Sequence, residues 1–385
     1  LQNEVEYDLA VIGGGSGGLA TAKEAARLGA KVLLCDFVKP TPLETQWGLG
    51  GTCVNVGCIP KKLMHQAALI GEVMKDAPAF GWEMPAAKPV MVWESMVKHV
   101  QNHIKSLNFK YRVELDQAMV TYENGLARFP VGTDGHTIET VCSKGNIRTV
   151  TAANVVVAVG GRPTPLDCAG SEWALSSDDL FSISSAPRKT CIIGGSYIAL
   201  ECAGFLAGFG YDVTVLVRSI LLRGFDRDCA ERIERDLTEK GVKFLYGVVP
   251  ESIEETSQNR KQVTWKSSGN DEVDCLNVPH MQRSDVFDTV FAAVGRSADT
   301  SALGLDAVGV QYNLRNGKIF ANAAEQTSVP HIYAIGDVME GCPELTPVAI
   351  QAGRTLAKRL FQHDFHAQTD YHHIPTTVFT PLEYG

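Results

Sequence analysis

The chain has 385 residues, 45% of them hydrophobic, and its 44 acidic and 35 basic residues give a formal net charge of −9. This acidic balance argues against nucleic acid as a partner. No apolar run approaches the roughly 18 residues that span a bilayer, so we expect no membrane contact. Ten cysteines are too sparse for a secreted disulfide scaffold, which indicates an intracellular protein, cytoplasmic or mitochondrial.

Residues 6–36 predict a strand, a glycine turn, a helix and a second strand. The runs 7–12 and 31–35 are apolar, and residues 19–28 have helical periodicity. This βαβ order is typical of a nucleotide-binding module.

The glycine turn of this module satisfies the pattern G-x-G-x-x-G with Gly13, Gly15 and Gly18. The first glycine permits a tight turn, the second lets the backbone approach a pyrophosphate, and the third brings helix and strand together. Asp36 ends the next strand 21 residues after Gly15, where a carboxylate accepts a hydrogen bond from a ribose hydroxyl. The module therefore predicts a dinucleotide site. A solvated strand-end acid is the alternative for Asp36.

Cys53 and Cys58 follow, with four residues between them. A zinc site would need a second ligand pair, and none stands nearby. A turn with a glycine can bring the two cysteines within the separation that a disulfide tolerates. Pro60 fits the first turn of a helix, so Cys58 would lie at a helix N-terminus, where the dipole and Lys61 favour a thiolate. We interpret the cysteines as a redox pair, with two buried structural thiols as the alternative.

The middle of the chain predicts a long helix at residues 92–113, followed by a strand-rich segment with turn signals. Residues 155–159 predict a buried strand. This strand ends in the turn Gly160-Gly161-Arg162-Pro163, which we interpret as the exit from a first domain.

The same βαβ order returns at residues 190–217. In its glycine turn, Ser196 replaces the middle glycine. Val217 stands where the first module has its acid, and Arg218, Ser219 and Arg223 follow. A carboxylate there would repel a 2′-phosphate, whereas guanidinium groups bind it in a bidentate fashion. The second nucleotide is therefore predicted to be NADPH, with two exposed arginines in a solvated loop as the alternative.

The last third of the chain is less regular. Residues 257–283 are polar and weakly patterned, which predicts hairpins and loops. Two apolar strands, residues 290–294 and 331–335, each end in glycine. A short extended stretch at residues 374–379 follows, and the chain stops at Gly385 as though in the middle of a domain.

These motifs resemble the pyridine nucleotide-disulfide oxidoreductase family over essentially the whole chain, and within it the large animal-type thioredoxin reductases. The segment 53–62 is similar to that of thioredoxin and glutathione reductases. Residues 37–49 resemble an insertion of thioredoxin reductases that is longer than the glutathione reductase link. Ser196 and the run 217–226 also resemble thioredoxin reductase. Glutathione reductase and the fused thioredoxin-glutathione reductases are the neighbouring alternatives.

The resemblance implies an α/β fold with two Rossmann-like, three-layer domains, in which the NADPH-binding domain is inserted in the FAD-binding domain. The implied FAD-binding domain comprises residues 1–163 and 297–368, and the NADPH-binding domain comprises residues 164–296. Residues 369–385 would begin an interface domain for dimerisation. Because full-length relatives continue into that domain, we expect a chain truncated before most of the dimer contact and before the acid–base histidine.

The resemblance also implies two cofactors, FAD and NADPH, no metal, and a role for each of the following positions. The catalytic residues would be Cys53, Cys58, Lys61 and Glu201. FAD would be bound by Gly13, Gly15, Ser16, Gly17, Gly18, Asp36, Gly51, Thr52, Gly160, Asp337, Glu344, Leu345, Thr346 and Pro347. NADPH would be bound by Gly194, Ser196, Tyr197, Ile198, Arg218, Ser219, Arg223, Gly295 and Arg296.

In the implied reaction, NADPH gives a hydride to FAD, whose electrons open a Cys53–Cys58 disulfide. Cys58 would stay against the flavin as a thiolate, and Cys53 would attack the next disulfide. The implied acceptor is a protein disulfide such as thioredoxin, and the full-length form is expected to be a homodimer. Tyr111 resembles a tyrosine near the disulfide in this subfamily. A truncated, non-catalytic FAD-binding fragment is a further alternative.

Overall fold

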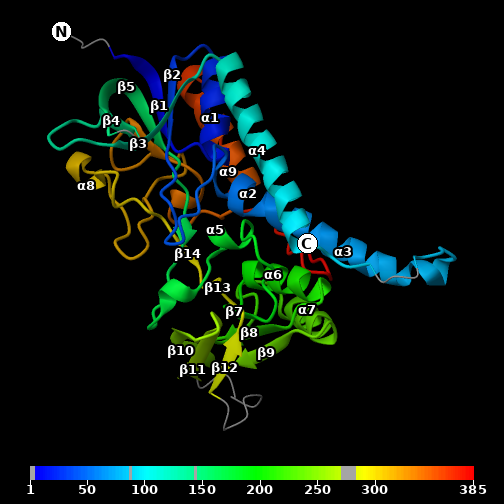
Figure 1. The fold of residues 1–385 in the computed structure, drawn as a ribbon. Coiled ribbons are helices and arrows are strands. Elements are labelled where there is room, and N and C mark those ends of the chain that lie inside the picture. Colours follow the sequence, from blue (N-terminus) through cyan, green and yellow to red (C-terminus); the bar gives the residue numbers. More distant parts are fainter. Residues whose placement is uncertain (1–4, 86–88, 143–144, 270–282) are drawn as a thin grey trace.

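The computed structural model describes residues 5–85, 89–142, 145–269 and 283–385. Figure 1 shows two layered α/β regions, each built around its own sheet, and the C-terminus lies where the regions meet. None of the described helices is both long and apolar enough to cross a membrane.

The first sheet combines strands from both ends of the chain. Five of its strands are parallel and lie side by side in the order β3, β2, β1, β5, β15. If only these five are counted along the chain, the order is third, second, first, fourth, fifth. This order is typical of dinucleotide-binding sheets. The outer parts of β3 and β5 pair antiparallel with β4. The strands are β1 (Tyr7–Ile12), β2 (Val32–Asp36), β3 (Thr121–Arg128), β4 (Thr137–Cys142), β5 (Ile147–Val157) and β15 (Ile332–Ala334).

Small residues let two helices pack closely beside this sheet. α1 (Ser16–Arg27) and α9 (Thr346–Phe361) meet at Gly353, where an added Cβ would lie 2.4 Å from the Thr21 hydroxyl oxygen and 2.7 Å from the Gly17 carbonyl oxygen. The long helix α4 (Trp93–Gln117) runs beside α1 (Figure 1). β1 has only one exposed residue, as expected for a parallel strand covered on both faces.

The second sheet is also parallel, in the order β9, β8, β7, β13, which is again third, second, first and fourth. Helices α6 and α7 lie beside it in Figure 1, and a three-stranded antiparallel sheet, β10 to β12, is attached. These elements are β7 (Thr190–Ile193), α6 (Tyr197–Gly208), β8 (Val213–Val217), α7 (Arg227–Glu239), β9 (Lys243–Tyr246), β10 (Val248–Glu255), β11 (Lys261–Ser267), β12 (Ser284–Phe287) and β13 (Thr289–Ala292).

The chain leaves the first sheet after β5, builds the second sheet, and returns to the first sheet at β15. The two crossing segments pair with each other as β6 (Arg162–Pro163) and β14 (Arg296–Ser297). The shorter elements are η2 (Ser171–Trp173), α5 (Ser177–Leu180), α8 (Leu305–Val308) and η3 (Gly336–Val338).

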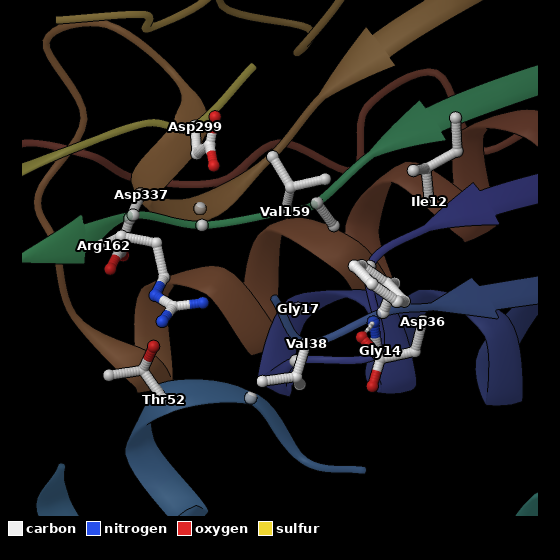
Figure 2. Close-up of a pocket in the computed structure, with 18 of the residues that line it drawn as sticks. Ile12, Gly14, Gly17, Asp36, Val38, Thr52, Val159, Arg162, Asp299 and Asp337 are labelled. Atoms are coloured by element: carbon white, nitrogen blue, oxygen red, sulfur yellow. Dashed lines mark hydrogen bonds between the residues drawn. The ribbon is translucent and has the colours of Figure 1, made fainter. Parts of the chain in front are cut away.

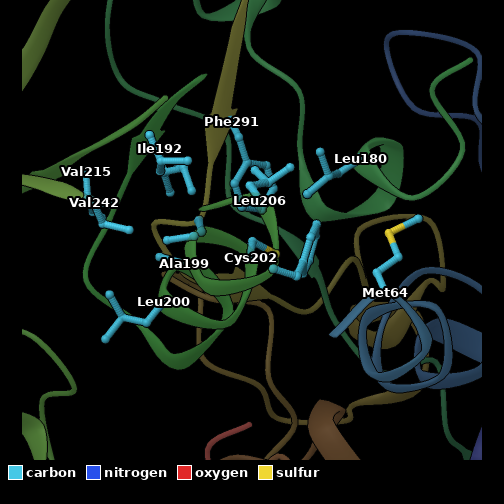
Figure 3. Packing of buried hydrophobic residues seen from close by; sticks show 14 of the residues in the cluster. Met64, Leu180, Ile192, Ala199, Leu200, Cys202, Leu206, Val215, Val242 and Phe291 are labelled. Atoms are coloured by element: carbon cyan, nitrogen blue, oxygen red, sulfur yellow. The ribbon is translucent and has the colours of Figure 1, made fainter. Parts of the chain in front are cut away.

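The helix α2 (Gly51–Val56) lies near the junction of the two regions, and α3 (Cys58–Asp76) begins there and runs outward, followed by η1 (Ala77–Phe80) (Figure 1). Met64 of α3 is fully buried in a cluster with Cys202 and Leu206 of α6 and Leu180 of α5 (Figure 3). This packing fixes the helix that begins at Cys58 against the second sheet.

Three sequence predictions are refined by the structure. The helix predicted at residues 92–113 continues to Gln117, since Leu115 still packs in the core. Within residues 257–283, β11 forms as part of a hairpin, and residues 270–282 lie outside the described part. Residues 374–379 form no strand; Val378 makes a single bridge with Tyr384. The next amide, that of Phe379, donates to the Glu201 carboxylate at 2.9 Å.

Candidate active site

A cavity of about 460 Å³ lies at the carboxyl ends of β1 and β5, where the strand order of the first sheet reverses (Figure 2). Ligands bind at this point in open parallel sheets. Cys53 and most of the predicted FAD positions line it: Gly13, Gly15, Ser16, Gly17, Asp36, Gly51, Thr52, Gly160, Asp337 and Thr346.

The glycines build one wall of the cavity from bare backbone. Gly13 has φ of +111°, and an added Cβ would lie 2.4 Å from the Ala158 carbonyl oxygen. Gly51 has φ of +71°, and its Cβ would lie 2.6 Å from the Gly15 Cα. Gly18 does not line the cavity. It lies behind the turn, where a Cβ would come within 1.9 Å of the Gly13 carbonyl oxygen. The wall therefore fits a diphosphate that approaches backbone closely.

Asp36 closes the far end of this wall. Its Oδ1 accepts a hydrogen bond of 2.8 Å from the Gly14 amide. Burial raises the pKa of this carboxyl, and the hydrogen bonds from the Gly14 and Phe37 amides oppose the shift. The carboxylate lines the cavity, where it can accept from a ribose hydroxyl.

The opposite wall is formed by Asp337 and by the start of α9. Burial raises the pKa of Asp337, with Glu344 adding to the shift. Thr346 is the first residue of α9 and faces the cavity. Three predicted FAD positions beside it do not line the cavity. Glu344 is exposed and pairs with Lys318 at 2.6 Å, while Leu345 and Pro347 flank the helix start.

Cys53 lies in α2, and Cys58 is the first residue of α3, as predicted. Cys53 lines the cavity, and the Cys58 sulfur lies 4.0 Å from the Thr346 hydroxyl oxygen. The pKa of Cys58 is lowered to about 6, chiefly by the hydrogen bond with the Cys53 thiol and also by Lys61, which together outweigh the effect of burial. The same hydrogen bond and burial raise the pKa of Cys53 far above its ordinary range. Both shifts favour a thiolate at Cys58 and a thiol at Cys53.

Lys61 and Glu201 meet beside this pair. Lys61 Nζ lies 2.7 Å from Glu201 Oε2, and the two side chains are 11% and 2% exposed. Burial alone would lower the pKa of Lys61, but Glu201 outweighs it and the net shift is upward. Lys61 is therefore a fixed cation one helical turn from Cys58.

Tyr197 and Arg296 lie next to the ion pair. Lys61 Nζ is 4.8 Å from the centre of the Tyr197 ring. Arg296 donates hydrogen bonds to the Thr52 hydroxyl at 3.2 Å and to the Gly161 carbonyl oxygen. Arg296, a position predicted for NADPH, thus lies against the wall of the first cavity, and Tyr197 lies beside Lys61.

The other predicted NADPH positions belong to the second sheet. Gly194 has φ of +129°, and its Cβ would lie 2.3 Å from the Ala293 carbonyl oxygen, whereas Ser196 caps α6 by accepting from the Ala199 amide. Ile198 follows in the first turn of α6, and Gly295, with φ of +130°, follows β13. At the end of β8, Arg218 and Arg223 are exposed, and Arg223 donates to the buried Ser219 hydroxyl at 2.8 Å.

Comparisons with known proteins agree with this geometry. Residues 7–353 match the family model described as pyridine nucleotide-disulphide oxidoreductase. The chain belongs to this family. It is 51% identical to "Thioredoxin reductase SEP1" of Emiliania huxleyi over 391 aligned residues, covering 99% of this chain and 75% of that protein. It is 50% identical to "Thioredoxin reductase 2, mitochondrial" of Drosophila melanogaster, covering 99% of this chain and 71% of that protein.

These findings identify the chain as a disulfide oxidoreductase of the thioredoxin reductase type. For Tyr111, which resembled a tyrosine near the disulfide in this subfamily, burial raises the pKa most, followed by Glu114 and then Cys53.

Sequence reasoning missed several residues of this oxidoreductase's cavity. Trp47, Arg162 and Asp299 line it, although none was predicted to bind a cofactor. A signal for two of them was present, since Trp47 lies in the subfamily insertion and Arg162 follows the Gly160-Gly161 turn. Their meeting could not be predicted, because it depends on contacts more than 100 residues apart in the chain.

Proposed function

We propose that this chain is an NADPH- and FAD-dependent disulfide reductase in which the Cys53–Cys58 pair relays the electrons. The overall reaction converts NADPH, a proton and a disulfide into NADP⁺ and two thiols. The observation that carries the proposal is the position of a thiolate–thiol pair between a glycine-walled cavity and a buried cation.

The cavity would hold FAD. Gly13, Gly15 and Gly51 would receive the diphosphate, Asp36 would accept from the adenosine ribose, and Asp337 would accept from the ribityl chain. FAD, when bound, takes a hydride from NADPH and supplies two electrons to a disulfide. The start of α9 at Thr346 would place backbone N–H groups and the positive end of the helix dipole at the reacting end of the cavity.

Cys58 would be the sulfur that receives the electrons. The Cys53 hydrogen bond and Lys61 favour its thiolate, so opening of the Cys53–Cys58 disulfide leaves the negative charge where it is best stabilised. Cys53 would leave this step as a thiol and then attack the acceptor disulfide by thiol exchange, after losing its proton to a base. Cys53 lines the cavity, whereas the Cys58 sulfur lies 4.0 Å from the Thr346 hydroxyl oxygen, so the assignment of Cys58 rests on charge rather than on proximity.

The second sheet would bind NADPH. Arg218 and Arg223 are exposed cations beside a buried serine at the end of β8, which suits a 2′-phosphate. Tyr197 lies between this sheet and Lys61, and would cover the nicotinamide pocket. Arg296 would stand at the junction between the two nucleotides.

The two sheets support the proposed division into domains. Residues 1–163 and 297–368 would form the FAD-binding domain, residues 164–296 the inserted NADPH-binding domain, and residues 369–385 part of an interface region. The relatives are named thioredoxin reductases, one of them mitochondrial, so we propose thioredoxin or a similar protein disulfide as acceptor. A homodimer in the cytoplasm or in mitochondria is the proposed working form.

An anaerobic titration of the purified protein tests this proposal. We expect a yellow protein that releases FAD on denaturation and whose flavin absorbance falls on addition of NADPH. The double variant R218M/R223M should weaken reduction by NADPH and leave reduction by NADH unchanged. A colourless protein that takes up no FAD, or a flavin that NADPH does not reduce, would contradict the proposal.

A further inference from the structure

Residues 37–49 connect β2 to α2 without forming a helix or a strand, and they lie over the cavity. Phe37, Val38, Lys39 and Trp47 line it from this loop. The loop therefore forms one side of the cavity in which a dinucleotide would lie.

Arg162 contacts both ends of this loop from the opposite side of the cavity. Its Nη1 donates to the Lys39 carbonyl oxygen at 3.0 Å, and its Cζ lies 4.7 Å from the centre of the Trp47 ring. Figure 2 shows the Arg162 side chain extending from its strand toward Thr52, along the wall of the cavity. One guanidinium thus joins the crossing strand β6 to the start and the end of the loop.

Asp178 holds this guanidinium in place. Its side chain is 1% exposed, and its Oδ2 accepts from Arg162 Nε at 2.8 Å. Asp178 does not line the cavity, and it lies in α5, whose start is fixed by the Ser176 cap. The neighbouring Asp179 accepts a buried hydrogen bond of 2.6 Å from the Thr41 hydroxyl in the middle of the loop. The loop is therefore attached to α5 twice, directly through Thr41 and indirectly through Arg162.

We propose that Arg162, oriented by Asp178, is a positioning residue that holds the loop 37–49 over FAD and sets the rate at which FAD dissociates. This inference rests on the proposed function, since it takes FAD as the occupant of the cavity. A guanidinium is needed at this position, because a single planar group must donate to the Asp178 carboxylate and to the Lys39 carbonyl oxygen and also stack on the Trp47 indole. A lysine keeps the charge but makes fewer of these contacts at once.

The test is the rate of FAD release from the holoprotein, followed by the rise in free flavin fluorescence after dilution. R162M should release FAD at least about tenfold faster than the wild type, as expected for the loss of one charged hydrogen bond and one cation–π contact. R162K should release FAD at a rate between those of the wild type and R162M. D178N, which leaves the cavity lining intact, should also release FAD faster.

R260M is the matched control. Arg260 pairs with Asp288 at 3.2 Å and is 34% exposed, against 27% for Arg162, but it lies beside the second sheet, away from the cavity. This variant should release FAD at the wild-type rate. Hydrogen–deuterium exchange supplies a second readout, in which R162M should speed exchange in residues 37–49 and R260M should not.

The outcomes separate this inference from the proposed function. A yellow wild type whose R162M and D178N variants release FAD at the wild-type rate would overturn the role of Arg162 and leave the proposed function intact. A wild type that binds no FAD would overturn both. If R162M fails to fold, T41V loosens the same loop at its other attachment, and it too must release FAD faster than the wild type.

Discussion

Lys61 and Glu201 join the redox helix to the second sheet through an ion pair of 2.7 Å that is almost completely buried. Glu201 also accepts from the Phe379 amide through its other oxygen, so one carboxylate connects α3, α6 and the segment near the C-terminus. The pair places a cation next to Cys58 and holds the helix that carries it.

Loss of Lys61 is predicted to destabilise the protein strongly. K61M leaves Glu201 buried without its cation, which should cost about 3–5 kcal/mol in the free energy of unfolding. K62M is the control. Lys62 follows directly and pairs with Glu383 at 2.6 Å, but both side chains are more than 40% exposed, so it should cost less than about 1 kcal/mol. Urea unfolding of the two variants measures the difference. Equal losses would contradict the role of the buried pair.

Removal of the Cys53 thiol is predicted to raise the pKa of Cys58. In C53A the hydrogen bond to the Cys58 thiolate is lost, so its pKa should move from about 6 toward the ordinary value of about 8.5, with Lys61 holding back part of the shift. The thiolate fraction at pH 7 should then fall. The pH dependence of alkylation of reduced protein reports this pKa. A midpoint of alkylation that stays near pH 6 in C53A would show that the Cys53 thiol does not cause the low pKa of Cys58.

The Asp36 carboxylate is predicted to lower the stability of the apoprotein at neutral pH and to strengthen the binding of FAD. Its pKa is raised in the folded state, so the folded protein binds this proton more tightly than the unfolded chain. Its contribution to stability therefore falls as pH rises through the interval from the ordinary pKa, about 3.9, to the raised value. D36N keeps the Gly14 hydrogen bond and removes the charge.

The D36N apoprotein should therefore melt at a higher temperature than the wild type at pH 7 and lose this part of the pH dependence. Its affinity for FAD should fall by about tenfold, because a neutral amide accepts more weakly from a ribose hydroxyl. Calorimetry of the apoprotein gives the melting temperature, and titration with FAD gives the affinity. A lower melting temperature would contradict the assigned sign.

Two glycine substitutions should have opposite effects. G18A places a Cβ within 1.9 Å of the Gly13 carbonyl oxygen, so the helix and the glycine turn must separate, and both stability and FAD binding should fall. G71A lies in the interior of α3 with nothing within 4 Å of the new atom, and it should stabilise the protein by about 0.5–1 kcal/mol. Thermal melting of the two variants compares them. Stabilisation by G18A would contradict the close approach of turn and helix.

Local features of the sequence predicted much of this fold. Both βαβ modules have the predicted strands and helices, and Cys58 begins a helix with Pro60 in its first turn. These elements follow from apolar periodicity and glycine positions within about 30 residues, which local rules describe well.

Contacts between distant segments could not be predicted in the same way. The family resemblance implied a contact of Arg296 with NADPH, and the structure adds that Arg296 donates to Thr52, 244 residues away. Arg162, Asp178 and Trp47 meet because β6, α5 and the loop 37–49 converge at the crossing between the sheets. Glu344 and Pro347 lie at the start of α9 but do not line the cavity, because the helix turns Thr346 and Ala349 toward it instead. Such orientations depend on the packed structure rather than on spacing along the chain.

The central claim is that NADPH reduces a flavin-linked cysteine pair in which Cys58 carries the thiolate. Anaerobic reduction of the holoprotein, followed by absorbance, tests it most directly in the wild type, C53A and C58S. The account predicts that a long-wavelength charge-transfer band between the Cys58 thiolate and oxidised flavin appears in the wild type after two-electron reduction. In C53A, which has no disulfide to reduce, the band should be present before reduction at a pH above the pKa of Cys58, and in C58S it should be absent in both states. A band that persists in C58S and disappears in C53A would contradict the assignment of the two cysteines.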